Sequence, residues 1–225
     1  MQSRGAQKAR ITYDKHSRLY DGLFHGLLRV GEPVNAVVKN HQYLDRPGMN
    51  VLDAGCGSGL FTHALMDHDR NADSARFHAF DISQAMLNRF QRENQQRGVM
   101  DLEMLTADAT TMRLPEYWPK FDLIVSCGMV EHLKSELPLV CDKLLQHLAP
   151  GGKLVLFMAR DNMLTRPLLQ SWGAQGLDPH VIKAALKQSS HCGQIEEKLI
   201  PGKCLSIEKL ANHTNYVIEV TPKKV

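Results

Sequence analysis

The sequence of 225 residues predicts an α/β fold, a mostly parallel sheet of seven strands with helices on both faces. Strand-like apolar runs alternate with helical patterns, and the first five runs are joined by connections long enough for the crossovers that parallel strands need. Gly55, Asp81 and Asp108 each end or follow one of these runs. Because ligands bind at the carboxyl ends of strands in open α/β sheets, the same pattern predicts a ligand site there.

Composition and charge indicate a single globular domain. Hydrophobic residues make up 43% of the chain, charged residues make up 23%, and the formal net charge is +3. A dedicated nucleic-acid binder would carry a clustered Lys/Arg footprint, so we do not favour one, although an RNA substrate stays open. The polar first ten residues predict no secretory signal, and no apolar run has membrane-spanning length. Five scattered cysteines without a C-x-x-C pair indicate reduced thiols in a cytoplasmic protein.

The first 46 residues are predicted to form a helical lid over the domain. Leu19, Leu23 and Leu27 recur at helix-like intervals, which favours two short helices in this segment. Tyr13 and Tyr20 stand seven residues apart. If one helix runs through both, this spacing places the two tyrosines on one face.

The main domain begins with a strand, a glycine-rich turn and a helix over residues 50–68. A short apolar run contains Asp53 and leads into three alternating glycines, Gly55, Gly57 and Gly59. Glycine accepts a positive φ and has no Cβ, so the turn would bring main-chain N–H groups close to a bound molecule. The first turn of the following helix adds unpaired N–H donors and a partial positive charge, which suit an anionic group.

The spacing of these glycines excludes the two commonest nucleotide motifs. A dinucleotide fingerprint, G-x-G-x-x-G, fails because Leu60 or Thr62 occupies its last position, and no Gly-Lys-Ser/Thr follows as in a phosphate loop. The carboxylate of Asp53 would repel phosphate but attract a cationic amine. The turn therefore predicts a nucleoside site without a pyrophosphate, and a zwitterionic amino-acid group fits it.

Two further strands and a helix follow the first helix. A strand over residues 76–82 ends in an acid, Asp81, and a third strand over 102–107 is closed by Asp108. Between them, Ser83 is the expected N-cap of a helix over 84–97 that ends at Gly98. This arrangement would bring two carboxylates to the same edge of the sheet as the glycine turn.

The next elements complete the parallel part of the sheet. The apolar run at 121–126 predicts a fourth strand that is buried on both faces. Ser135 is the expected cap of a helix with an inward apolar stripe, and Pro150-Gly151-Gly152 is expected to turn the chain into a fifth strand over 153–159.

The last third of the chain changes character. Residues 161–193 are helical and mixed, and we interpret them as a cap inserted after the fifth strand. Residues 194–200 and 215–220 are predicted to form a closing antiparallel pair. The single domain then divides into a lid (1–46), a core (47–160), the cap (161–193) and the closing pair (194–225).

Five motifs in this order carry a family resemblance. They are VLDAGCGSG at 51–59, DISQAML at 81–87, ADA at 107–109 with LP at 114–115, FDLIVS at 121–126 leading to EHL at 131–133, and LAPGG at 148–152. Together they resemble the class I S-adenosylmethionine-dependent methyltransferases, especially the broad group that includes ubiquinone and menaquinone biosynthesis methyltransferases. The resemblance covers residues 13–160 and implies a Rossmann-like fold with S-adenosylmethionine as cofactor.

The resemblance implies a role for each strand-end residue. The backbone from Gly55 to Gly59 would hold the methionine end of the cofactor, with Asp53 near its amino group. Asp81 would accept hydrogen bonds from both ribose hydroxyls, and Asp108 would accept one from the adenine amino group. Each also has a plain structural alternative, as a turn, a helix cap or an ordinary strand end. The implied cofactor-binding set is completed by Cys56, Ile82, Met86, Ala109 and Ser126.

Three residues are candidates for catalysis under the same resemblance. His132 follows the fourth strand, and its imidazole could take a proton from the acceptor as the methyl group arrives. Tyr13 and Tyr20 could close over the cofactor or position the acceptor, and simple helix packing is the alternative for both. A metal is not expected, because Gly128 stands where similar ubiquinone O-methyltransferases carry a further glutamate.

The acceptor is expected to be a small molecule bound by the lid and the cap. An apolar cluster in residues 163–172 would suit a hydrophobic, quinone-like or lipid-like molecule methylated on O, N or C, although such residues also form a cap's own core. Methylation of tRNA or protein is one alternative. A non-catalytic cofactor-binding module and a nicotinamide-dependent oxidoreductase are the others.

Overall fold

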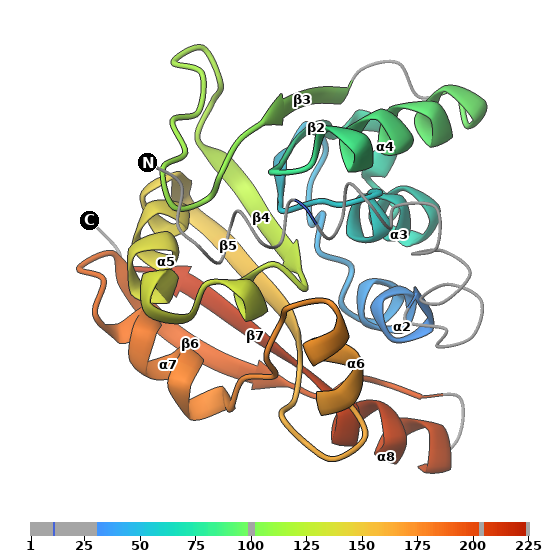
Figure 1. Ribbon diagram of the computed structural model, residues 1–225. Helices are drawn as coiled ribbons and strands as arrows, with labels where there is room; N and C mark the ends of the chain where they lie inside the picture. The colour runs from blue at the N-terminus through green and yellow to red at the C-terminus, as the bar shows by residue number, and fades with distance from the viewer. Residues whose placement is uncertain (1–10, 12–30, 99–101, 203–204, 224–225) are drawn as a thin grey trace.

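A computed structural model describes residues 11, 31–98, 102–202 and 205–223, and within them seven strands form one sheet (Figure 1). The order across the sheet is β3-β2-β1-β4-β5-β7-β6. The strands are β1 (Asn50–Ala54), β2 (Arg76–Asp81), β3 (Leu102–Thr106), β4 (Phe121–Cys127), β5 (Leu148–Ala159), β6 (Cys192–Lys198) and β7 (Asn215–Pro222). The predicted α/β fold is confirmed.

Strands β1 to β5 pair in parallel, and β7 runs antiparallel to both β5 and β6. Asp53 of β1 is paired with Ala79 of β2 on one side and with Val125 of β4 on the other. The carboxyl ends of these three strands therefore lie level at one edge of the sheet. The predicted antiparallel closing pair is confirmed. A helix that the sequence reading missed, α8 (Leu205–Thr214), lies between its two strands in the chain.

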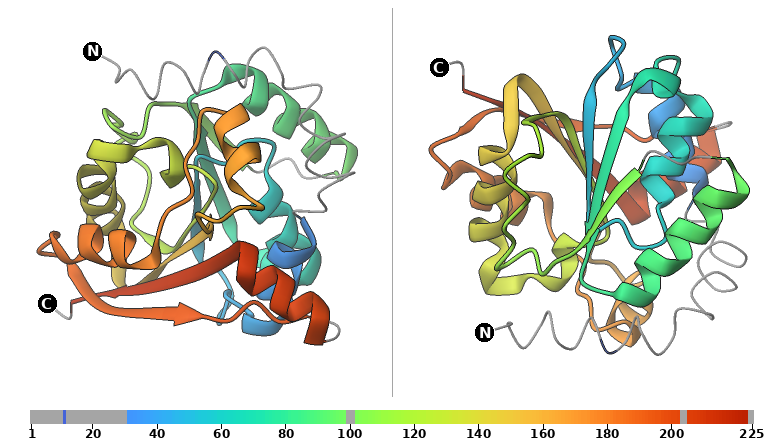
Figure 2. Two further views of the ribbon diagram at one scale, coloured as in Figure 1. Left: turned by 60° about the horizontal axis from the view of Figure 1, so that its bottom comes forward. Right: turned by 90° about the horizontal axis from the view of Figure 1, so that it is seen from above.

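Helices cover both faces of the sheet, as Figures 1 and 2 show. One face carries α2 (Gly31–His41), α3 (Leu60–His68) and α4 (Gln84–Gln96), and the other carries α5 (Leu137–Gln146) and α7 (Pro179–Lys187). Neighbouring residues of β1 serve opposite sides, since Val51 belongs to the apolar core with α2 and α3, and Leu52 to the core with α5 and α7. This alternation is the period of two that a strand covered on both faces must show.

The sequence predicted the N-cap of α4 correctly and that of α5 incorrectly. The Ser83 hydroxyl accepts a hydrogen bond from the Met86 N–H at 3.2 Å, which confirms it as the N-cap of α4. Ser135 does not cap α5, because a 3₁₀ turn (Lys134–Glu136) intervenes and the helix begins at Leu137. The Ser135 hydroxyl instead donates to a Glu136 carboxylate oxygen at 3.1 Å.

The expected turn at residues 150–152 lies inside a strand. Strand β5 already begins at Leu148, and its pairing with β4 shifts register between Phe121 and Leu123, so the extra residues form a bulge. Gly151 has a φ of +78° there, and a Cβ on Gly152 would lie 2.7 Å from the Phe121 carbonyl oxygen. The glycines therefore allow the bulge to lie close against β4.

The span interpreted as a cap contains two helices in different places. The short helix α6 (Arg166–Ser171) lies at the lower end of the sheet in Figure 1, whereas α7 packs along α5. Ile182 and Leu186 of α7 are fully buried in the same core as Val140 and Leu144 of α5. Thus α7 acts as an ordinary crossover helix of the sheet.

In the described part of the chain, no helix has both the length and the apolar character needed to cross a membrane.

Candidate functional site

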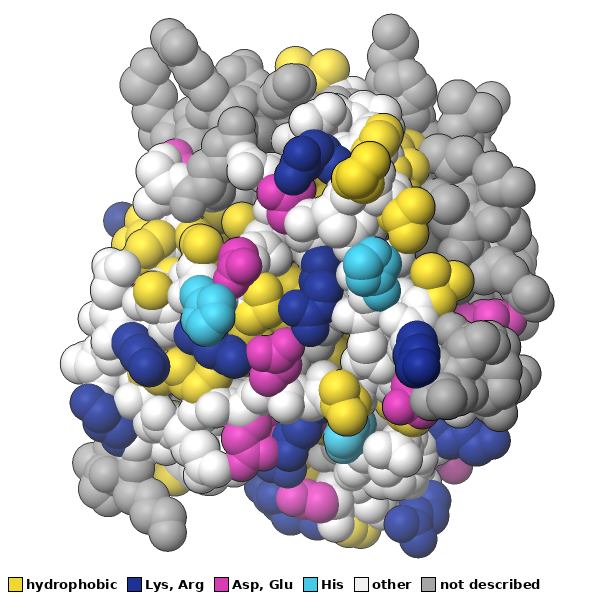
Figure 3. Space-filling view, turned by 90° about the horizontal axis from the view of Figure 1, so that it is seen from below, with side chains coloured by type: hydrophobic (Ala, Val, Ile, Leu, Met, Phe, Trp, Pro, Cys, Tyr) yellow, Lys and Arg dark blue, Asp and Glu magenta, His cyan; other side chains and the backbone are white. Residues whose placement is uncertain are grey.

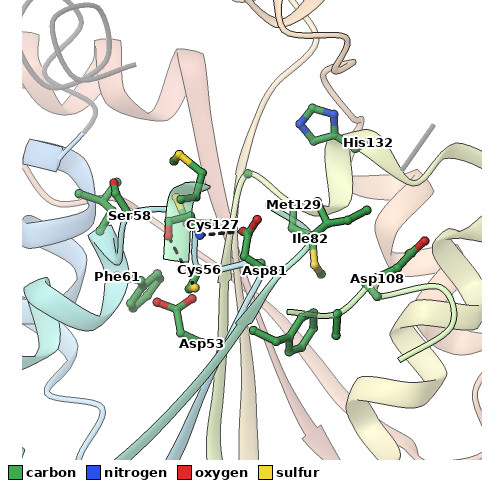
Figure 4. Close-up of a pocket in the computed structure, with 18 of the residues that line it drawn as sticks. Asp53, Cys56, Ser58, Phe61, Asp81, Ile82, Asp108, Cys127, Met129 and His132 are labelled. Atoms are coloured by element: carbon green, nitrogen blue, oxygen red, sulfur yellow. Dashed lines mark hydrogen bonds between the residues drawn. The ribbon is translucent and has the colours of Figure 1, made fainter. Parts of the chain in front are cut away.

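A cleft opens at the carboxyl ends of β1, β2 and β4. Its empty space is about 880 Å³, which includes the open mouth, and it lies where the strand order reverses between β1 and β4. This is the usual place for a ligand site in an open α/β sheet. Figure 4 shows side chains from several strand ends and from the segment after β4 around this cleft.

The glycine turn has the predicted backbone conformation. Gly55, Gly57 and Gly59 have φ values of +68°, +54° and +89°, all in the left-handed region. Their N–H groups, however, already have acceptors inside the protein. Gly55 N–H donates to the Phe80 carbonyl at 2.9 Å, Gly59 N–H to the Cys56 carbonyl at 2.8 Å, and Gly57 N–H to Asp81 (Figure 4). The N–H groups of the three glycines thus hold the turn together in this structure, and the role of the Gly55–Gly59 backbone toward a ligand stays a prediction.

The three glycines face different surroundings. A Cβ on Gly57 would meet only the terminal methyl of Met86, at 3.4 Å, so this position borders the open cleft. A Cβ on Gly55 would lie 2.6 Å from the Met129 side chain. A Cβ on Gly59 would lie 2.0 Å from the Phe90 ring of α4. Gly59 is outside the lining of the cleft, and its lack of a side chain lets α3 and α4 approach each other.

Asp53 lies at the floor of the cleft and is tied to helix α3. Its Oδ2 accepts hydrogen bonds from the Thr62 hydroxyl at 2.7 Å and from the Thr62 N–H at 3.3 Å. Burial raises the pKa of Asp53 to about 7, and Asp81 adds to this effect, while the two bonds from Thr62 oppose it. The carboxylate thus anchors the first turn of α3 beneath the glycine turn.

Asp81 is held in a fixed orientation at the end of β2. Its Oδ2 accepts the Gly57 N–H at 2.8 Å, and its Oδ1 accepts the Ser83 N–H at 2.8 Å. One carboxylate therefore bridges the glycine turn and the start of α4. Ile82 and Met86, which follow it, add apolar walls to the same cleft.

Asp108 differs from the other two acids in having an unused oxygen. Its Oδ1 accepts from both the N–H and the hydroxyl of Thr110, at 2.9 and 2.8 Å. Its Oδ2 is buried and has no hydrogen-bond partner among the described residues. Leaving a buried acceptor unsatisfied costs about 1–3 kcal/mol, so this oxygen indicates a ligand that would donate to it. Ala109 lines the cleft beside it.

His132 lies on the far wall, in a 3₁₀ turn (Val130–His132) after β4. Burial lowers its pKa to about 4, although a hydrogen bond with the backbone of Gly173 works in the opposite direction. The imidazole is therefore neutral at physiological pH and contacts the segment that follows α6. Tyr13 and Tyr20 lie outside the described residues.

One predicted cofactor residue lies elsewhere, and several lining residues were missed. Ser126 is buried, and its hydroxyl donates to the Ala54 carbonyl at 2.8 Å, so it joins β4 to β1 and does not line the cleft. Cys56 lines the cleft, as does Cys127, and burial raises the pKa of both thiols, which stay protonated. Met129 was missed, although the strand-end rule that selected Asp81 applies equally to the end of β4.

Comparison with known proteins adds independent observations. Residues 51–152 match the family described as "Methyltransferase domain". A ubiquinone biosynthesis O-methyltransferase of Coxiella burnetii is 31% identical over 121 residues, which cover 50% of this chain and 44% of that protein. The chain thus matches less than half the length of this curated relative.

Two solved structures share the fold over nearly the whole chain. The N-methyltransferase NodS of Bradyrhizobium japonicum WM9, in complex with S-adenosyl-L-homocysteine, superposes with a TM-score of 0.63 at 19% identity, covering 99% of this chain and 100% of that one. The [4+2]-cyclase SpnF superposes with a TM-score of 0.72 at 14% identity, covering 100% of this chain and 99% of that one. At these identities the likeness concerns the fold alone.

Proposed function

We propose, from the premise that this chain is a class I S-adenosylmethionine-dependent methyltransferase in family and fold, that it methylates a small molecule bound next to the cleft at the carboxyl edge of the sheet. One observation carries the proposal most directly: acids from the ends of three successive strands, Asp53, Asp81 and Asp108, line one cleft at the switch point.

The residues of the cleft fit S-adenosylmethionine by the chemistry of their side chains and backbone. The buried Oδ2 of Asp108, which has no partner among the described residues, would accept from the adenine amino group, with the Ala109 backbone next to it. Asp81 would accept from the ribose hydroxyls, since an ionised carboxylate can accept about four hydrogen bonds. Gly57 borders the open cleft and leaves room for the methionine end, and the Asp53 carboxyl group lies below the turn.

The protein would contribute mainly orientation to the methyl transfer. When bound, S-adenosylmethionine supplies an electrophilic methyl carbon on its sulfonium. Holding reacting groups in near-attack geometry supplies roughly 7–11 kcal/mol, which exceeds what one general base contributes. His132 is neutral and would accept a proton from the acceptor, but its pKa of about 4 makes it a weak base near pH 7.

The acceptor side of the site is proposed to come from the lid (1–46) and the cap (161–193). His132 and Gly173 contact each other, so the segment after α6 lies beside the cleft. The curated relative is named for O-methylation and NodS for N-methylation, and both atoms remain candidates here. We also place the protein in the cytoplasm, because the four described cysteines, Cys56, Cys127, Cys141 and Cys192, are free thiols.

Two other functions are less well supported. Among the described residues on the face that carries α6 and α8, acidic and basic side chains are intermingled and form no basic stripe of the kind that tRNA binding would need (Figure 3). A role without methyl transfer is represented in this fold by the cyclase SpnF. It would leave the cofactor cleft intact and give no methylated product.

Calorimetry with S-adenosyl-L-homocysteine tests the cofactor site. We expect Asp81→Ala to weaken binding by at least about tenfold, since hydrogen bonds to a charged group contribute roughly 1.5–3 kcal/mol. Asp122→Ala is the matched control, because Asp122 also accepts a backbone N–H, from Asn50 at 2.8 Å, but lies at the other end of its strand. Unchanged affinity in Asp81→Ala, or an equal loss in Asp122→Ala, would remove the ribose assignment.

The acceptor can be sought directly. A cell extract incubated with the enzyme and S-adenosylmethionine carrying a deuterated methyl group should yield one product heavier by the labelled methyl, detected by mass spectrometry. An Asp81→Ala sample serves as the control for non-enzymatic methylation. Cofactor binding without any labelled product would favour the non-catalytic module.

A further inference from the structure

A second cleft lies on the other side of the 3₁₀ turn that carries His132. It is lined by Glu131 of that turn, by Arg160 and Asp161 after β5, and by residues 175–179 and Val181 at the start of α7, together with Leu137. Its empty space is about 1100 Å³, open to solvent. None of the described residues lines both clefts, yet Glu131 and His132 are neighbours in the chain, so one short turn separates the two clefts.

Glu131 is the unusual group of this second cleft. Only 2% of its surface is exposed. Its Oε1 accepts the Ala159 N–H at 3.0 Å, while its Oε2 has no hydrogen-bond partner among the described residues. In the described part of the chain it also forms no ion pair. A buried carboxylate left in this state is costly, and buried charges in proteins are normally paired.

Arg160, a cation that lines the same cleft, interacts with other groups. Arg160 donates from Nε to the carbonyl oxygens of Asn212 at 2.8 Å and Asn215 at 3.3 Å, and from Nη2 to Glu197 at 2.8 Å. Its guanidinium also lies 4.9 Å from the ring centroid of Tyr216. Glu197 is paired with Lys183 as well, also at 2.8 Å, and the described residues show no ion pair between Arg160 and Glu131.

The remaining lining residues add negative charge at the rim and apolar walls. Asp161 and Asp178 are exposed, and Asp178 accepts the His180 N–H at 2.7 Å as the N-cap of α7. Asp161 is paired with Arg166 at 2.9 Å. The apolar walls come from Leu137, Leu177, Pro179 and Val181. A buried anion within apolar walls suits a cation carried on an apolar body.

We propose that the second cleft binds the protonated amine of the methyl acceptor, with Glu131 as its counter-ion and the apolar walls holding the body of the molecule. The inference rests on the proposed function and narrows the acceptor to an amine-bearing class. Burial raises the pKa of Glu131 to about 7, and an ammonium group beside the carboxylate would favour its ionised form.

The probe for this site is 2-phenylethylamine, with 2-phenylethanol as its uncharged counterpart, titrated into the full chain with and without saturating S-adenosyl-L-homocysteine. We expect wild type to bind the amine at least about tenfold more tightly than the alcohol, because only the amine carries a positive charge that can pair with the Glu131 carboxylate. This comparison needs no variant. Equal affinity for the two probes, or no binding of the amine, would overturn the proposal.

Variants then locate the interaction. Glu131→Gln keeps the size of the side chain and removes its charge, and it should weaken the amine about tenfold while changing affinity for the alcohol less than about twofold. Glu116→Gln makes the same chemical change at an exposed position outside both clefts and should bind like wild type. Unchanged amine affinity in Glu131→Gln would overturn the assignment.

S-Adenosyl-L-homocysteine separates this proposal from the proposed function. The amine should bind equally well with the first cleft filled, since the two clefts share no lining residue. Displacement of the amine by S-adenosyl-L-homocysteine would place it in the first cleft and overturn the inference. If S-adenosyl-L-homocysteine does not bind, only the proposed cofactor site is contradicted. The amine titration without S-adenosyl-L-homocysteine still tests the second cleft.

Discussion

Replacing Gly59 by alanine should destabilise the fold far more than the small size of the change suggests. The new Cβ would lie 2.0 Å from Cε2 and 2.2 Å from Cδ2 of Phe90, a fully buried ring, so the ring or the helix α4 must move. Overpacking of this kind costs about 1–3 kcal/mol. The φ of +89° adds about 1–2 kcal/mol for a residue with a Cβ in the left-handed region.

Gly48→Ala is the matched control for the backbone part of this cost. Gly48 has a φ of +75°, but a Cβ there would meet nothing within 4 Å. Both substitutions also stiffen the unfolded chain to a similar extent, by about 0.4–1 kcal/mol. The difference between the two variants therefore isolates the clash with Phe90, and we expect Gly59→Ala to be less stable by about 1–3 kcal/mol.

Urea unfolding followed by circular dichroism measures this difference. With an m-value of about 3 kcal/mol/M, the midpoint of Gly59→Ala should fall roughly 0.3–1 M below that of Gly48→Ala. Adding Phe90→Leu to Gly59→Ala should lose less than the sum of the two single changes, because the contacting pair is coupled. Equal midpoints for the two glycine variants would refute the packing role of Gly59.

Two further predictions concern titration and turnover. The pKa of Asp53 is raised from 3.8 to about 7 in the folded protein, so the native state holds this proton more tightly than the unfolded state does, and the free energy of unfolding falls as pH rises from about 4 to 7. Asp53→Asn should make this fall smaller than in wild type, as measured by urea unfolding from about pH 4.5 to 7.5. Parallel pH profiles for the two proteins would contradict the prediction. His132→Ala should lower turnover roughly ten- to a hundredfold, while the affinity for S-adenosyl-L-homocysteine changes less than about twofold. Equal turnover of wild type and His132→Ala at every pH would eliminate His132 as a base.

Local sequence signals predicted the strand ends well. The acids and glycines that close β1 and β2 stand next to apolar runs, so their positions follow from the alternation of strands and helices alone. The positive φ values of Gly55, Gly57 and Gly59 were likewise predictable, since glycine is the residue that adopts them readily. The partners of their N–H groups were not predictable, because Phe80 and Asp81 come from another strand.

Contacts between distant segments decided the remaining details. Ser126 follows the fourth motif and was assigned to the cofactor, but pairing of β1 with β4 brings its hydroxyl to Ala54 instead. Residues 161–193 were interpreted as one cap, yet α7 packs on α5 whereas α6 lies at the carboxyl end of the sheet. Ser135 failed as a cap because a 3₁₀ turn precedes α5. Each of these positions depends on which other part of the folded chain the segment packs against.

The sequence by itself determined the fold class, the order of the elements and the edge of the sheet where the acids gather, because these follow from periodicity and from residues that act on their own backbone. Only the tertiary structure decided which polar atoms remain unused. Asp108 and Glu131 are both carboxylates near strand ends, and the sequence gives no sign that one oxygen of each is buried without a hydrogen-bond partner in the described part of the chain. That property arises from packing, since a hydrogen bond missing at one site depends on every segment folded around it.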